Sequence, residues 1–175
     1  MADTTFRVAI ITSSDTGYAG EREDKSAPVI ENLVTEAGYT VTEKILLPDD
    51  KEMLKNAMAK ICDEGTADLI LTTGGTGFSP RDVMPEATKE VIQREAPGIP
   101  EAMRWFSLQI TGRAMLTRAA AGIREKTLII NMPGSPKAVQ NVWNISFRTS
   151  IMDWKFFWEL PVTAQENKAW CFIVA

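Results

Sequence analysis

Three short, continuous apolar runs constrain the fold of this chain more than any other feature. They are Val8-Ala9-Ile10-Ile11, Leu69-Ile70-Leu71 and Leu128-Ile129-Ile130, and each is too short to be a helix. Small or polar residues follow each run directly. Such runs are typical of strands that are buried on both faces, as in the middle of a parallel sheet.

Amphipathic patterns of helical period separate these runs. One apolar stripe, Val29-Ile30-Leu33-Val34, is followed by Gly38, and a second, Leu54-Ala57-Met58-Ile61, ends near Gly65. Glycine is common just beyond the end of a helix. Two further helices are predicted to open at Pro85 and Pro100, the latter running through Met103, Phe106 and Ile110.

Residues 41–47 alternate in part and predict a strand nearer the sheet edge. Strands that alternate with helices indicate an α/β fold, a three-layer α/β/α sandwich with a mostly parallel central sheet. The length of 175 residues suits one domain, and no linker or repeat interrupts it.

Polar segments follow the predicted strands at the points where ligands bind in such folds. These segments are residues 12–15, 48–50, 72–77 and 132–137, all rich in small, hydroxyl or acidic side chains. Because the carboxyl ends of parallel strands meet at one edge of a sheet, we expect the four segments to converge there.

The segment Thr72-Thr73-Gly74-Gly75-Thr76-Gly77 is the most informative of the four. Three glycines leave its backbone bare, so that successive N–H groups can form a nest for phosphate oxygens. No Gly-Lys-Ser/Thr closes it as in a P-loop, and it lacks the Gly-x-Gly-x-x-Gly spacing of dinucleotide folds. On composition alone, a tight turn after a buried strand explains it equally well.

Composition excludes several classes of partner and chemistry. The net charge of -4 and the pI of about 5.0 disfavour nucleic acid as a partner. The absence of histidine excludes a Ser-His triad or a His-bound zinc in the chain as written. We find no secretory signal and no apolar run of the ~20 residues that a membrane span needs. Cys62 and Cys171 match no metal-binding or redox spacing, which suggests a reducing compartment. We therefore expect a cytoplasmic protein without membrane contact.

A longer stretch carries a specific resemblance. Residues 72–88 read TTGGTGFSPRDVMPEAT, and this succession resembles the signature of the molybdopterin adenylyltransferase family. Further similarities are Ser13-Ser14-Asp15, residues 23–26, residues 116–119 and Pro133-Gly134-Ser135-Pro136-Lys137. The resemblance spans roughly the first four-fifths of the chain.

The resemblance implies transfer of AMP from ATP to the terminal phosphate of molybdopterin, with release of pyrophosphate, in molybdenum cofactor biosynthesis. It implies Asp49 and Asp82 as catalytic residues that also hold Mg²⁺. The implied substrate-binding residues are Ser13, Ser14, Asp15, Ser26, Thr73, Gly74, Gly75, Thr76, Gly77, Arg81, Thr117, Arg118, Pro133, Gly134, Ser135 and Lys137.

Several of these side chains have a structural alternative, and an exposed Arg81 could simply be solvated. Asp49 could cap the helix after Pro48 instead of binding a ligand, although Asp50 could serve as that cap and leave Asp49 free. Asp82 could cap a turn before Pro85, and the serines near residue 13 could cap the following structure. Lys137 could be an exposed lysine at a helix start.

Two alternative functions stay open. A relative that carries or scaffolds molybdopterin would bind it without efficient transfer. A general nucleotide-binding domain would bind NAD, although the glycine spacing disfavours it. The family resemblance also implies a homotrimer or homohexamer and allows a partner protein that inserts the metal.

Residues from about Trp143 depart from the family's usual ending, a Leu-Pro-His stretch, a helix and a short polar tail. The coding frame can be shifted from Val142 onward by joining the third base of each codon to the first two bases of the next codon. With third bases that the genetic code permits, the shifted frame encodes Leu-Glu-Tyr-Leu-Ile-Pro-His and reaches a stop codon across residues 167–168. We therefore expect that a single-base deletion put residues 143–175 out of frame, which would also explain the missing histidines. A genuinely divergent tail is the alternative, and sequencing the coding DNA decides between the two.

Overall fold

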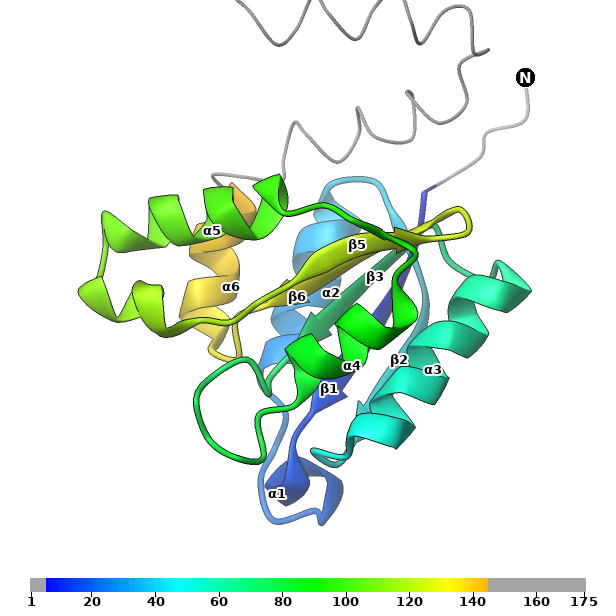
Figure 1. Ribbon diagram of the computed structural model, residues 1–175, viewed down its shortest axis with the longest axis horizontal. Coiled ribbons are helices and arrows are strands. Elements are labelled where there is room, and N and C mark those ends of the chain that lie inside the picture. Colours follow the sequence, from blue (N-terminus) through cyan, green and yellow to red (C-terminus); the bar gives the residue numbers. More distant parts are fainter. Residues whose placement is uncertain (1–5, 145–175) are drawn as a thin grey trace, which may run out of the picture.

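The computed structural model describes residues 6–144 and builds them around one six-stranded sheet (Figure 1). The strand order is β2-β1-β3-β6-β5-β4. The strands are β1 (Arg7–Ser13), β2 (Thr40–Leu47), β3 (Leu69–Thr73), β4 (Arg94–Glu95), β5 (Ala121–Arg124) and β6 (Thr127–Met132). The helices are α1 (Asp15–Tyr18), α2 (Ser26–Glu36), α3 (Lys51–Glu64), α4 (Met84–Val91), α5 (Gly98–Leu108), the 3₁₀ helix η1 (Gly112–Leu116) and α6 (Pro136–Val142).

The three apolar runs form β1, β3 and β6, the centre of the sheet. Each pairs in parallel with its neighbour, and β2 joins β1 in parallel at the sheet edge. Alternate residues of β1 point to opposite faces: Val8 and Ile10 belong to one core cluster, and Ala9 and Ile11 to the other. The prediction of central strands buried on both faces is therefore confirmed.

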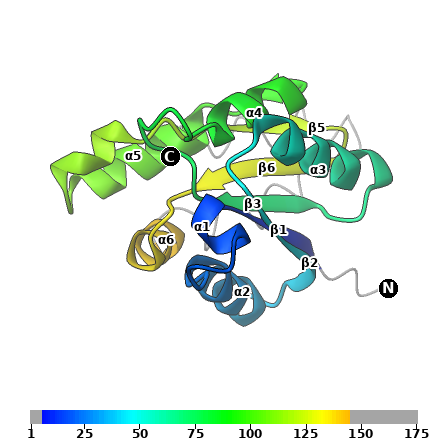
Figure 2. The same cartoon turned by 90° about the horizontal axis from the view of Figure 1, so that it is seen from below.

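Helices cover both faces of the sheet and complete three layers (Figure 2). Side chains of α2, α5 and α6 pack into one core cluster, and those of α3 and α4 into the other. The predicted α/β/α sandwich is confirmed.

The predicted helix ends are also found. Helix α3 begins after Asp50, whose carboxylate accepts the N–H of Met53 at 2.9 Å, and it ends at Gly65 in the left-handed conformation. Pro85 lies in the first turn of α4. Pro100 lies in the first turn of α5, but that helix ends at Leu108, so the expectation that it includes Ile110 is wrong.

The short strands β4 and β5 extend the sheet beyond β6. Strand β5 pairs antiparallel with β6 and with β4, so the sheet is mostly rather than entirely parallel. Buried Asn131 of β6 fastens this region: its side-chain amide donates to the hydroxyls of Thr72 and Thr88, and its carbonyl oxygen accepts the N–H of Ala120. One side chain thus joins β6 to β3, to α4 and to the segment before β5.

The connections from β1 and β3 place the site. From β1 the chain crosses through α2 to β2 on one side, whereas β3 leads to α4 and β4 on the other. Such a reversal leaves a crevice beyond the carboxyl ends of the two strands, where ligands bind in open α/β sheets.

Apart from Trp143 and Asn144, the residues of the frame-shift hypothesis lie outside the described residues. Trp143 is buried and packs edge-on against Tyr39 with ring centroids 6.4 Å apart. Among residues 6–144, no helix has the length and apolarity that crossing a membrane requires.

Candidate active site

A pocket of about 230 Å³ opens at the crevice between β1 and β3. Three of the four predicted strand-terminal segments line it, together with residues 22–26, and the fourth reaches the same edge through Asp49. The lining consists of Thr12, Ser13, Ser14, Gly17, Arg22, Glu23, Asp24, Lys25, Ser26, Thr73, Gly74, Gly134 and Pro136.

The glycine-rich segment turns sharply as it leaves β3. Gly74 and Gly75 have φ angles of 89° and 62°, which favour glycine. A Cβ atom on Gly74 would lie 2.2 Å from the carbonyl oxygen of Ser13, so the close approach of the two loops also requires glycine. The segment is thus brought against the end of β1.

The backbone amides of this segment are available to a ligand. Among the described residues, none accepts a hydrogen bond from the N–H groups of Gly74, Gly75, Thr76 or Gly77. Successive unpaired amides form a concavity that suits phosphate oxygens. Unpaired amides are what a phosphate nest requires, and the nest itself stays a prediction.

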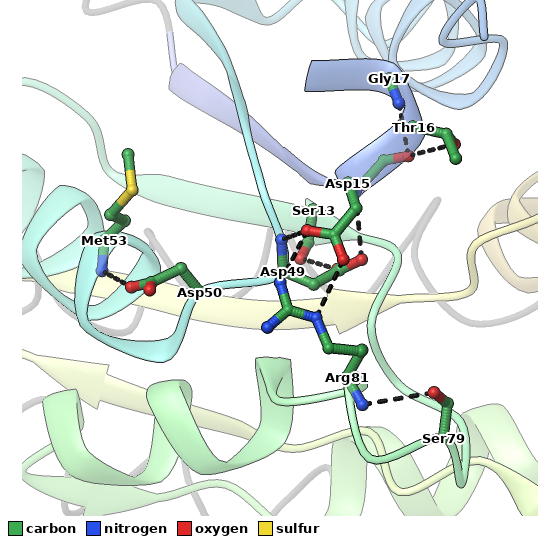
Figure 3. A network of polar contacts seen from close by, with 10 residues as sticks. Ser13, Asp15, Thr16, Gly17, Asp49, Asp50, Met53, Ser79 and Arg81 are labelled. Carbon is green, nitrogen blue, oxygen red and sulfur yellow. Dashed lines mark hydrogen bonds and ion pairs between the residues drawn. The ribbon is translucent and has the colours of Figure 1, made fainter. Parts of the chain in front are cut away.

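The carboxylate of Asp49 lies beside this segment and is held by the loop after β1 (Figure 3). The Ser13 hydroxyl donates to Asp49 Oδ1, and the Asp15 N–H donates to Asp49 Oδ2 at 3.2 Å. In return, the Asp49 N–H donates to Asp15 Oδ1 at 2.9 Å. Because Asp50 caps α3, Asp49 is free for these contacts, as the sequence suggested.

Arg81 spans from the end of the glycine-rich loop to Asp15 (Figure 3). Its Nε and Nη2 atoms donate to the two carboxylate oxygens of Asp15 at 2.9 and 2.8 Å. The hydrogen bonds from Arg81, and then the one from the Asp49 N–H, hold the pKa of Asp15 below its ordinary value. The same ion pair raises the pKa of Arg81.

Asp82 and Arg118 shape the far side of the loop. Asp82 Oδ2 accepts the N–H of Ser79 at 2.7 Å, so this carboxylate closes a turn. Arg118 donates from Nε to the Gly77 carbonyl at 2.6 Å, from Nη2 to the Asp82 carbonyl, and from Nη1 to Glu86. Its guanidinium therefore holds the loop in shape instead of facing the pocket.

The two predicted metal ligands flank the glycine-rich segment from different sides. Asp49 Oδ1 lies 3.5 Å from the place where a Cβ of Gly75 would be, and Asp82 Oδ2 lies 2.9 Å from that of Gly77. Within residues 6–144, no cluster of three or more acidic or cysteine side chains could hold a metal. Two carboxylates fit Mg²⁺ only where substrate phosphates and water complete its shell, which is how Mg²⁺ is commonly bound.

Sequence reasoning missed a polar network at the base of the pocket. The Asp24 carboxylate accepts the Thr12 hydroxyl at 2.6 Å and the N–H groups of Ser26 and Ala27 at 2.9 and 3.2 Å. The Ser26 hydroxyl donates to the Gly134 carbonyl at 2.9 Å. An aspartate two residues before a helix start is a capping signal, so Asp24 was recognisable as structural from the sequence.

Arg22 and Lys25 also line the pocket; Lys25 belongs to the segment 23–26 that the family resemblance included, whereas Arg22 was not singled out from the sequence. Both are exposed, and neither is paired with a carboxylate in the described part of the chain. The lining also contains two carboxylates, those of Glu23 and Asp24, so the charged side chains of the pocket carry both signs.

Several residues implied by the family resemblance have partners within the protein. Ser14 caps α1 through the N–H of Gly17 at 3.0 Å, and Ser135 caps α6 through the N–H of Ala138 at 3.2 Å. The Thr73 hydroxyl donates to the Pro133 carbonyl at 2.8 Å, which ties the two loops together. Lys137 is exposed on α6 and does not line the pocket, and the Thr117 hydroxyl accepts the N–H of Ala119 at 3.3 Å.

Comparison with known proteins agrees with this geometry. A family model described as a probable molybdopterin binding domain matches residues 9–152. The chain is 40% identical over 138 residues to a protein of Helicobacter pylori strain J99 named molybdopterin adenylyltransferase, with 78% of each chain covered. It is 39% identical to the Escherichia coli K12 protein of the same name, covering 78% of this chain and 71% of that one.

Solved structures show the same likeness. A molybdopterin biosynthesis enzyme of Thermus thermophilus superposes with a TM-score of 0.81 at 40% identity, covering 87% of this chain and 96% of that one. A tungsten cofactor synthesizing protein of Pyrococcus furiosus gives a TM-score of 0.78 at 34% identity, with 89% and 98% covered. The matched region contains the glycine-rich loop, both flanking aspartates and the pocket, and the chain belongs to the molybdopterin-binding family that includes the molybdopterin adenylyltransferases.

Proposed function

We propose that this protein is a molybdopterin adenylyltransferase, which transfers AMP from Mg-ATP to the phosphate of molybdopterin and releases pyrophosphate. The observation that carries the proposal is the row of unpaired amides from Gly74 to Gly77, which lies between the carboxylates of Asp49 and Asp82 and beside the pocket. The relatives named for this activity support it, since they match over most of the chain.

The chemistry needs no nucleophilic side chain, because an oxygen of the pterin phosphate attacks the α-phosphorus of ATP. The protein has to hold two anions in line and to offset their repulsion. Two phosphate charges ~4 Å apart repel by roughly 4 kcal/mol at an effective dielectric constant of 20. The unpaired amides of residues 74–77 supply hydrogen-bond donors for this purpose.

Mg²⁺ belongs to the same proposal. When bound, it neutralises charge on the phosphate oxygens. Asp49 and Asp82 would hold it from the two sides of the glycine-rich loop. Ser13 and Asp15 orient the Asp49 carboxylate, and the bond from Ser79 orients that of Asp82.

The pocket suits the pterin end of molybdopterin. The hydroxyl oxygen of Ser13 and the carbonyl oxygen of Gly134 each have one bond within the protein and keep a lone pair with which to accept from a heterocycle that has donors on its edge. We assign the pterin to this pocket and its phosphate to the side nearest Gly74.

The direct test incubates the protein with molybdopterin and Mg-ATP and measures released pyrophosphate. We expect release that depends on both substrates, and we expect Asp82→Ala to abolish it while the far-ultraviolet circular dichroism stays that of wild type. Tight molybdopterin binding without release above background would identify the chain as a carrier instead. Full activity of Asp82→Ala would remove Asp82 from the mechanism.

We further propose that the protein is a cytoplasmic homo-oligomer, a trimer or hexamer, that associates through α5 and η1. Four large apolar side chains on these two helices and on the turn between them are 47–65% exposed: Trp105, Ile110, Met115 and Leu116. Monomeric proteins rarely expose a contiguous apolar surface of this kind. Delivery of the adenylylated pterin to a metal-inserting partner would follow the transfer.

A further inference from the structure

The family resemblance implies that Arg81 contacts substrate, but its guanidinium is used within the protein. Two of its donors engage both oxygens of one carboxylate, that of Asp15, in a bidentate pair. Bidentate pairing orients both partners, because two parallel bonds define the plane of the carboxylate. Figure 3 shows Arg81 reaching across to Asp15 from the loop between β3 and α4, where the Arg81 N–H donates to the Ser79 hydroxyl.

Asp15 is in turn joined to Asp49 by two reciprocal bonds. The N–H of each residue donates to the carboxylate of the other, at 3.2 and 2.9 Å. One Asp49 oxygen is therefore held by the Asp15 backbone, and the other by the Ser13 hydroxyl. The direction of the Asp49 carboxylate depends on where Asp15 lies, and Arg81 helps to place Asp15.

We propose that Arg81 is a positioning residue that acts on Asp49 through Asp15, and not a phosphate-binding group. This inference rests on the proposed adenylyl transfer, in which Asp49 is a catalytic carboxylate. The Arg81–Asp15–Asp49 relay joins the loops after β3, β1 and β2, the three segments whose relative placement determines where the two phosphates meet.

A role in stability does not explain this contact. The side chains of Arg81 and Asp15 are 61% and 43% exposed, and ion pairs at such sites add little to the free energy of folding because water screens them. The charged groups around Arg81 are Asp15, Asp49 and Asp50, all acidic, so its charge is committed to this group of carboxylates.

A double-mutant cycle tests the relay. Arg81→Met, Asp15→Asn and the double variant are compared with wild type for kcat and for the KM of ATP. Small misplacements at a reacting centre cost about 100-fold in rate, so we expect Arg81→Met to lower kcat by roughly 10- to 100-fold with KM changed less than about 2-fold. In the Asp15→Asn background, the same substitution should change kcat by less than about 2-fold.

The opposite pattern overturns the relay. If Arg81 binds phosphate directly, Arg81→Met raises the KM of ATP and does so equally with or without Asp15. Arg81→Lys separates geometry from charge, since lysine keeps the charge but cannot pair in a bidentate manner. We expect it to restore less than half of the lost kcat, whereas full restoration would mean that charge alone is used.

A matched control comes from a similar ion pair elsewhere. Arg124 donates from Nε and Nη2 to the two oxygens of Asp63 at 2.8 and 3.0 Å, on the α3–β5 side of the molecule. Arg124→Met removes the same kind of contact without touching the relay, so we expect unchanged kcat. A loss of kcat equal to that of Arg81→Met would indicate a general effect of removing such a pair.

A measurement without substrate distinguishes failure of the relay from failure of the proposed transfer. Carboxyl ¹³C NMR, with Asp49 assigned through Asp49→Asn, reports the setting of this side chain directly. We expect Arg81→Met to shift the Asp49 resonance in the wild-type background and to leave it unchanged in Asp15→Asn. An unshifted Asp49 resonance in Arg81→Met overturns the relay, even if wild type releases no pyrophosphate.

Discussion

Gly74 adopts a left-handed backbone conformation and also lies close to the end of β1. Its φ is 89°, and a Cβ would lie 2.2 Å from the Ser13 carbonyl oxygen. We expect Gly74→Ala to lower the free energy of unfolding by about 3 kcal/mol, because backbone strain and the clash add. Urea denaturation followed by circular dichroism measures this.

Gly98 provides the matched control for that experiment. It has no positive φ, and a Cβ there meets nothing within 4 Å. Gly98→Ala should therefore be neutral, or it should stabilise the protein by about 0.5 kcal/mol because alanine lowers the conformational entropy of the unfolded chain. If both substitutions cost the same, the geometry at Gly74 is not what makes glycine necessary.

The residues of the site show how far sequence reasoning extends. The cap of α3 was foreseeable from the sequence. Either of the adjacent aspartates can cap a helix, and Asp49 was expected to be functional, which left Asp50 as the cap. The placement of Arg22 at the pocket was not foreseeable, since the path of residues 19–22 follows from no periodicity. The Arg81–Asp15 pair joins residues 66 positions apart and needs the folded sheet to be seen.

Among the elements, β6 depends on the buried amide of Asn131. Asn131→Ala removes the acceptor of the Ala120 N–H and the donor to the Thr72 hydroxyl in a region closed to water, and it leaves the Thr88 hydroxyl with its bond to the Met58 sulfur alone. Unsatisfied buried groups cost about 1–3 kcal/mol each, so we expect a loss of about 2–3 kcal/mol after partial relaxation. The exposed amide of Gln140 on α6 is the control, and Gln140→Ala should change stability by less than about 0.5 kcal/mol, both measured in urea.

Helix α3 and strand β5 are linked by a contact that responds to pH. Hydrogen bonds from Arg124 hold the pKa of Asp63 below its ordinary value of 3.8. A carboxylate with a lower pKa in the folded state stabilises the fold above pH 3.8 and loses this effect as the pH falls through the lowered pKa. We expect the melting temperature of Asp63→Asn to fall less than that of wild type when the pH is lowered from about 4 to about 2, as measured by thermal unfolding. The neighbouring exposed carboxyl of Glu64 is the control, and an equally small fall for Glu64→Gln would contradict this assignment.

Elements with a strong apolar pattern were predictable, and short ones were not. The buried runs of β1, β3 and β6 are continuous and can satisfy their backbone only within a sheet. Strand β4 is two residues long and exposed, so its sequence carries no apolar signal. Strand β5 turns back along β6 through Glu125, a non-glycine residue with φ of 50°, for which composition offers no turn signal.

At the scale of the molecule, the apolar face on α5 and η1 projects to one side of the sheet (Figure 1). If copies associate there, a charge at its centre should separate them. We expect the double variant Trp105→Glu/Met115→Glu to sediment as a monomer of about 19.4 kDa, whereas wild type sediments as a trimer or hexamer. Met53→Glu, an exposed apolar position on α3, should leave the wild-type assembly intact, and a monomeric wild type would remove the proposal.

Arg118 links the apolar surface on η1 to the glycine-rich loop. It follows the end of η1 by two residues, and its backbone and guanidinium together hold the carbonyls of Thr76, Gly77 and Asp82. If copies of the chain associate through η1, the same contacts would hold residues 74–77 in place through Arg118. We then expect turnover per chain to fall when dilution dissociates the copies and to rise with protein concentration until assembly is complete.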